Sequence, residues 1–131
     1  MRDWGVPGDQ VAVLIVDDQA PFRRAARAVV GLTPGFEVVE EAKSGEEAIE
    51  LVDRLTPGLV LMDINMPGIS GIEAARHITA EHPGVVVVLL STYQADDLSA
   101  DALDCGATAY VNKEEFGPAV VQDLWAGRAQ T

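Results

Sequence analysis

The chain has 131 residues, 48% of them hydrophobic, which is enough for one domain with a buried core. Acidic residues outnumber basic ones by 21 to 9, and a net charge of −12 argues against direct nucleic-acid binding, which depends on Lys and Arg. No apolar run reaches the ~18 residues of a membrane span. Residues 1–10 form an irregular lead-in without a secretory apolar stretch, and the single cysteine excludes an internal disulfide, so we expect a cytoplasmic protein.

The first part of the chain alternates strand and helix patterns. Residues 11–16 are entirely apolar and predict a buried strand that ends on Asp17-Asp18. Pro21 fits the first turn of the helix that follows. Residues 36–40 mix apolar and charged positions and predict an edge strand. Residues 44–47 match a capping box, which opens a helix that ends before Pro57. The first helix carries arginines opposite its apolar face, namely Arg23, Arg24 and Arg27.

The second part continues the alternation. A short apolar run over 59–62 predicts a strand buried on both faces, and it ends on Asp63 before a Pro-Gly turn. Residues 70–73 form a second capping box, and the helix that they open runs to about residue 82. Residues 85–90 predict a third buried strand. A helix over about 95–105, a short strand over 109–111 and a helix from Pro118 to Gly127 complete the series.

Five strands that alternate with five helices predict an α/β fold with a parallel sheet covered by helices on both faces. The three long apolar strands are expected inside the sheet and the two short ones at its edges. We expect one domain over 11–127, with 128–131 as a tail.

Polar residues follow four of the strands: Asp17 and Asp18, Asp63, Ser91 and Thr92, and Lys113. The carboxyl ends of parallel strands meet at one edge, so these side chains should converge there. Two unit charges ~4 Å apart repel by roughly 4 kcal/mol near a protein surface, so such a cluster suits a cation. Oxygen ligands favour Mg²⁺. The first strand–helix turn carries two carboxylates where a phosphate-binding site would have glycine-rich backbone amides, so it would repel a free phosphate. It suits a phosphoryl group only when a metal ion bridges that group to the protein, which leaves Asp63 as the carboxylate nucleophile.

The motifs at these positions resemble the receiver domain of two-component response regulators. They are Val16-Asp17-Asp18, residues 62–71 around Asp63, Leu90-Ser91-Thr92, and Tyr110-Val111-Asn112-Lys113. The resemblance covers 11–127. It implies the flavodoxin-like (CheY-like) doubly wound (βα)5 fold with strand order 2-1-3-4-5 and the site between the first and third strands.

The resemblance also implies roles for single residues. Asp63 is expected to be the phosphoacceptor. Asp18 would bind Mg²⁺ directly, Asp17 mainly through water, and Asn65 through its backbone carbonyl. Lys113 would pair with Asp63 or with its phosphoryl group.

Three further residues are expected to serve the switch. Ser91 would hydrogen-bond the phosphoryl oxygens, with Thr92 beside it, and Tyr110 would turn inward as Ser91 moves. Lys113 precedes Glu114, where many receivers have Lys-Pro, so we expect a trans bond there. This departure resembles receivers that precede LuxR-type helix-turn-helix domains.

The function implied is a Mg²⁺-dependent phosphoacceptor switch, not an enzyme acting on a free substrate. A sensor histidine kinase or a phosphotransfer protein would supply the phosphoryl group and would dock on the first helix. The arginines of that helix are either contacts for this partner or a solvated face. The face formed by 95–105, 109–111 and the last helix would signal to a second receiver or to an output domain that controls transcription. The alternatives are a phosphohydrolase of the haloacid dehalogenase type and a phosphorylation-independent interaction module.

Three residues outside this set carry simpler expectations. His77 and His82 are expected to be surface residues of the helix that begins near residue 71. Cys105 is expected to be a small buried apolar residue.

Overall fold

The computed structural model describes residues 10–92 and 104–127. Its strands form one parallel sheet of order β2-β1-β3-β4-β5, so the predicted doubly wound α/β fold is confirmed. The predicted helix over 95–105 lies outside the described residues, except for Asp104 and Cys105, which form a turn and a bend. The elements are β1 (Val11–Val16), α1 (Ala20–Gly31), β2 (Phe36–Ala42), α2 (Gly45–Leu55), β3 (Leu59–Asp63), α3 (Gly71–Glu81), β4 (Val86–Ser91), β5 (Ala109–Asn112), the 3₁₀ turn η2 (Lys113–Glu115) and α5 (Pro118–Gly127).

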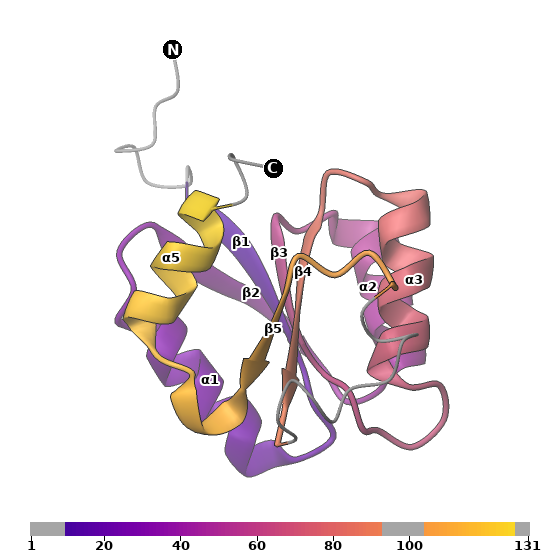
Figure 1. Cartoon of the computed structure of the whole chain (residues 1–131), viewed down its shortest axis with the longest axis horizontal. Helices are drawn as coiled ribbons and strands as arrows, with labels where there is room; N and C mark the ends of the chain where they lie inside the picture. The colour runs from indigo at the N-terminus through magenta and orange to yellow at the C-terminus, as the bar shows by residue number, and fades with distance from the viewer. Residues whose placement is uncertain (1–9, 93–103, 128–131) are drawn as a thin grey trace.

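Helices cover both faces of the sheet. α1 and α5 lie on one side, and α2 and α3 lie on the other (Figure 1). Every residue of β3 and β4 is buried, and β2 and β5 lie at the edges, as the apolar runs predict. None of the helices within the described ranges has the length and apolar character needed to cross a bilayer.

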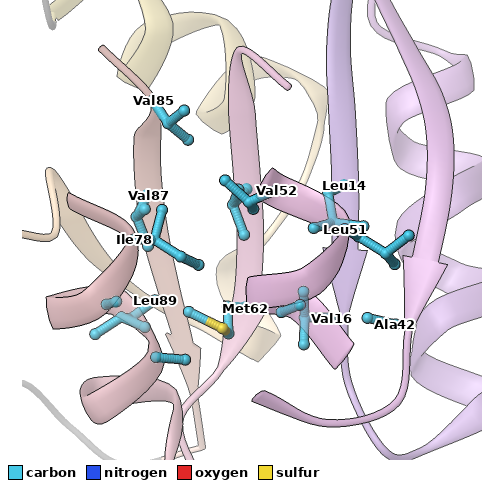
Figure 2. Close-up of a cluster of buried hydrophobic side chains, with 14 of the residues drawn as sticks. Leu14, Val16, Ala42, Leu51, Val52, Met62, Ile78, Val85, Val87 and Leu89 are labelled. Atoms are coloured by element: carbon cyan, nitrogen blue, oxygen red, sulfur yellow. The ribbon is translucent and has the colours of Figure 1, made fainter. Parts of the chain in front are cut away.

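The sheet separates two apolar cores. In β1, Leu14 and Val16 face α2 and α3, whereas Val13 and Ile15 face α1 and α5, because successive residues of a strand point to opposite faces. Figure 2 shows the first core, in which Ile78 of α3 lies beside the strand residues. Because the interior strands are buried on both faces, their register in the sheet is fixed. The polar residues at their carboxyl ends therefore have fixed positions as well.

Strand β2 is longer than predicted. It continues past Glu40 to Ala42, because an irregularity in the pairing between Val13 and Leu14 brings Ala42 opposite Val16. The charge of Glu41 is tolerated in this edge strand because two arginines of α1 pair with it. The extension brings β2 level with the end of β1.

Serine caps fix the starts of two helices. Ser44 Oγ accepts a hydrogen bond from the backbone N–H of Glu47, and Ser70 Oγ accepts one from that of Glu73, each at 3.1 Å. In the first box the Glu47 carboxylate accepts from the N–H of Lys43, one residue before the usual partner. Both helices therefore begin where the capping motifs predict.

Candidate functional site

Three carboxylates meet at the carboxyl ends of β1 and β3. Asp17, Asp18 and Asp63 each place one oxygen within 4.8 Å of the other two. Asp17 is fully buried, Asp63 is 6% exposed and Asp18 is half-buried. The structure thus brings together the acidic residues whose convergence the strand pattern predicts, with Asp18 nearest to solvent.

Lys113 lies between two of these carboxylates. Its Nζ is 2.7 Å from Asp17 Oδ2 and 3.5 Å from Asp63 Oδ1, so in this structure its closer partner is Asp17. The same nitrogen is 4.4 Å from the centroid of the Phe22 ring, which forms an aromatic wall beside it. The described part of the chain contains no cis peptide bond, so the bond after Lys113 is trans, as expected.

Every backbone and side-chain polar atom of Asp17 has a partner. Its N–H donates to the carbonyl of Ala42 at 3.0 Å, and its Oδ1 accepts from the N–H of Gln19 at 2.8 Å. Its carbonyl accepts from Arg23 Nη1 at 2.7 Å, and its Oδ2 accepts from Lys113. Because its N–H, its carbonyl and both carboxylate oxygens are all hydrogen-bonded, Asp17 is held in a single orientation.

Asp63 is a carboxyl group whose charge is only partly compensated. Burial, and then the negative charge of Asp17, raise its pKa above the ordinary value, whereas Lys113 and a hydrogen bond with the backbone of Asn65 act in the opposite direction. The raising effects dominate. A further cation at this edge would therefore lower the free energy of the ionised form.

The loop after β3 is held against its neighbours. The N–H of Gly71 donates to the carbonyl of Ile64 at 2.8 Å, and a Cβ at position 71 would collide with the carbonyl oxygen of Asp63. The N–H of Ile69 donates to Glu46 Oε2 of α2 at 3.2 Å. Sequence reasoning placed Glu46 in a capping box and missed this contact. The loop that leads from Asp63 into α3 is therefore tied to α2.

The remaining predicted residues are spread along this edge. Ser91 is buried at the end of β4, whereas Thr92 and Asn65 are exposed. Tyr110 is half-buried on the side of the sheet covered by α2 and α3, with its hydroxyl 3.8 Å from Cys105 Sγ. Burial first, and then the neighbouring Cys105, raise the pKa of Tyr110 to about 12, so its hydroxyl is neutral near pH 7.

Two interpretations of surface residues need correction. Arg23 and Arg27 are not simply a solvated face, because their Nε atoms lie 3.2 and 2.6 Å from the two carboxylate oxygens of Glu41. His82 is not a plain surface residue. It caps the end of α3, and its Nε2 lies 2.8 Å from Asp53 Oδ1 of α2. Hydrophobic periodicity identifies the buried face of a helix, but not the partners of long polar side chains.

Known proteins are similar to this chain over most of its length. Residues 13–124 match the family model of the response regulator receiver domain. The chain is 35% identical over 114 residues to the transcriptional regulatory protein DegU of Brevibacillus brevis, and this match covers 87% of this chain and 48% of that protein. It is 42% identical over 111 residues to protein-glutamate methylesterase/protein-glutamine glutaminase 4 of Myxococcus xanthus (strain DK1622), with 84% of this chain and 31% of that protein covered. The chain thus spans about half or less of these relatives.

A solved structure supports the same assignment. The two-component response regulator of the LuxR family from Aurantimonas sp. SI85-9A1 is similar with a TM-score of 0.81 and 34% identity, over 92% of this chain and 86% of that one. The expected resemblance to receivers of the LuxR type is therefore confirmed, and the haloacid dehalogenase alternative is not favoured. Since the family model matches well over half of the sequence, this chain belongs to the response regulator receiver domain family.

Proposed function

We propose that Asp63 accepts a phosphoryl group from the phosphohistidine of a sensor kinase or a phosphotransfer protein, in a reaction that requires Mg²⁺. The observation that carries this proposal is the environment of Asp63: a residue only 6% exposed at the end of an interior strand, with Lys113 Nζ 3.5 Å from its carboxylate and two more carboxylates beside it. An Asp63 oxygen attacks phosphorus, the P–N bond breaks, and the bonding electrons return to the histidine nitrogen. Later attack by water releases inorganic phosphate.

The acidic cluster fits a hard divalent cation. Its donors are carboxylate oxygens, which suit Mg²⁺ better than softer metals. Within the described residues the Asp18 carboxylate makes no hydrogen bond or ion pair, which supports Asp18 as the direct ligand. Both oxygens of Asp17 already accept hydrogen bonds, which supports a contact through water, and the backbone carbonyl of Asn65 would complete the protein's share. When bound, the ion neutralises charge on the transferred phosphoryl oxygens.

Residues at the ends of β4 and β5 would respond to the new charge. Lys113 would hold a phosphoryl oxygen, and Ser91, with Thr92 beside it, would supply hydroxyl groups. Tyr110 would then change its packing at β5 as Ser91 moves. A local change at Asp63 would thereby shift the population of conformations at β5 and α5, and in the helix that the sequence predicts over about 95–105.

The partners follow from this chemistry. The donor would be a kinase or a phosphotransfer protein docked on α1, and a second copy of the receiver could pair through the face at β5 and α5. DegU is named as a transcriptional regulator and the Myxococcus relative as a methylesterase. We infer that residues 11–127 act as the receiver unit of a cytoplasmic regulator with a transcriptional output. The receiver itself would turn over no free substrate and contact no nucleic acid.

The test is the intact mass of the protein after incubation with acetyl phosphate, with Mg²⁺ or with EDTA. We expect the mass of one added phosphoryl group in the wild type with Mg²⁺ only, and no addition in Asp63→Asn. Asp123→Asn makes the same substitution at an exposed position of α5 and should be labelled like the wild type. Equal labelling of Asp63→Asn and the wild type would refute the assignment of Asp63.

A further inference from the structure

We propose that Arg23 is a positioning residue of the acidic site, which holds the Asp17–Asp18 turn in the geometry that binds the divalent cation. This inference rests on the proposed function, in which Asp17 and Asp18 face the metal. It concerns a residue that the sequence pattern assigned to a docking or solvated face. The structure gives Arg23 a different place.

The side chain of Arg23 is directed toward the site. It is only 13% exposed, and its Nη1 donates to the backbone carbonyl of Asp17 at 2.7 Å. That carbonyl belongs to the peptide that joins Asp17 to Asp18, at the point where the chain leaves β1 for α1. The direction of this peptide plane sets the direction in which the Asp18 side chain leaves the backbone. Arg23 therefore acts on Asp18 through the main chain.

Glu41 fixes the position of the guanidinium. Its Oε1 accepts from Arg23 Nε at 3.2 Å, while its Oε2 accepts from Arg27 Nε at 2.6 Å. Glu41 is available there because β2 extends to Ala42, level with Asp17. The guanidinium thus joins the end of β2, the helix α1 and the first carbonyl after β1. Because α1 and Glu41 of β2 fix the position of the Arg23 guanidinium, it can hold the Asp17 carbonyl in one direction.

The other contacts of Asp17 define what Arg23 adds. The N–H of Gln19 and the amine of Lys113 hold the Asp17 carboxylate, and the carbonyl of Ala42 holds its N–H. These three contacts would survive the loss of Arg23. At Asp17, only the carbonyl of the 17–18 peptide would lose its hydrogen bond. Removal of Arg23 should therefore affect the orientation of Asp18 and cation binding more than it affects the fold.

Arg27 provides a matched control. It lies one turn further along α1, pairs with the same Glu41 and carries the same charge, yet it is 53% exposed, and among residues 10–92 and 104–127 its side chain hydrogen-bonds Glu41 alone. Arg23→Met and Arg27→Met each remove one positive charge and one arm of the Glu41 pair. Only Arg23→Met removes the donor to Asp17. Because the experiment below contains no kinase, a role of either arginine in kinase docking does not affect its result.

The experiment is calorimetric titration of each metal-free protein with Mg²⁺, together with labelling by acetyl phosphate. We expect the Mg²⁺ dissociation constant of Arg23→Met to rise about tenfold or more, the usual effect of removing a group that orients a metal ligand. Arg27→Met should stay within about twofold of the wild type, because its contact lies outside the chain of atoms that reaches Asp18. Arg23→Lys keeps the charge but lacks the planar fork, so it should also weaken binding, and it serves as the second variant if Arg23→Met fails to fold.

The outcomes separate this inference from the proposed function. Wild-type affinity in both Arg23 variants, with normal Mg²⁺ binding by the wild type, would overturn the positioning role alone. An equal loss in Arg27→Met would also overturn it, since the effect would then be one of general charge. Failure of the wild type to bind Mg²⁺ would overturn the metal site itself, and the inference with it.

Discussion

Replacement of Asp63 by Asn should stabilise the protein when no metal is present. The carboxylate is nearly buried, and it faces two like charges and one lysine. The amide has almost the same shape but carries no charge, so the substitution removes the repulsion without leaving a cavity. A substitution that abolishes the proposed reaction should therefore raise the free energy of unfolding at pH 7.

The expected size follows from the distances. At an effective dielectric constant of about 20, charges 4.8 Å apart, the largest separation among these three oxygens, repel by about 3.5 kcal/mol, and charges 3.5 Å apart attract by about 5 kcal/mol. Repulsion of Asp63 by Asp17 and Asp18 thus exceeds attraction by Lys113 by about 2 kcal/mol, and burial adds to the cost. At about 4 °C per kcal/mol for a domain of this size, Tm should rise by about 8 °C.

The effect should depend on pH with a defined sign. The pKa of Asp63 in the folded protein lies above the ordinary value of 3.8, so between these two values the folded state holds more protons than the unfolded chain. Stability of the wild type therefore falls as pH rises through this window, and above the folded pKa the loss is complete. The Asn variant lacks this group. Its advantage should be small below pH 3.8 and reach a plateau at higher pH.

The assay is urea unfolding in EDTA at a series of pH values, followed by circular dichroism. Asp123→Asn, at an exposed position, should show no comparable gain. Mg²⁺ at ~100 times its dissociation constant should add about 2.7 kcal/mol to the wild type, and less to Asp63→Asn. The reasoning is refuted if Asp63→Asn is no more stable than the wild type at pH 7, or if its advantage does not grow with pH.

Two further substitutions probe the neighbours of Asp63. Asp18→Asn should raise Tm in EDTA and abolish the rise that Mg²⁺ produces in the wild type; an unchanged Mg²⁺ response would exclude Asp18 as a ligand. Gly71→Ala should cost about 2–3 kcal/mol in urea unfolding and slow the labelling of Asp63, because its Cβ would meet the Asp63 carbonyl oxygen and push α3 from β3. Gly84→Ala, with open space around the added Cβ, is its control, and equal stability of the two variants would contradict the clash.

Much of the fold and part of the site were predictable, because two simple rules apply. Short apolar runs that alternate with amphipathic helices specify a parallel sheet, and a parallel sheet collects the residues after its strands at one edge. Asp63 is the last residue of β3, and Asp17 and Lys113 directly follow β1 and β5, so their meeting required no knowledge of side-chain conformation. The order of the strands came from the family resemblance, and the pairing confirms it.

The contacts of long side chains could not be predicted in the same way. Lys113 was expected to pair with Asp63, and its Nζ does lie 3.5 Å from Asp63 Oδ1, but the closer contact with Asp17 Oδ2, at 2.7 Å, was not foreseen. Lys113 is the first residue of η2, and its Nζ lies 4.4 Å from the centroid of the Phe22 ring. Several freely rotating bonds separate the charge of a lysine from its backbone. Sequence position therefore fixes the neighbourhood of that charge, but not its partner.

The same limit explains why two contacts near the acidic site were missed. Arg23 of α1 holds the carbonyl of Asp17, and Glu46 of α2 holds the N–H of Ile69. Both residues occupy polar positions of amphipathic helices, where periodicity indicates a solvated face. Each instead reaches a backbone atom of the loop beside its helix, at the sheet edge where strands end and backbone groups lack sheet partners. A polar helix residue next to a loop that carries a candidate site should therefore be tested as a loop anchor before it is assigned to solvent.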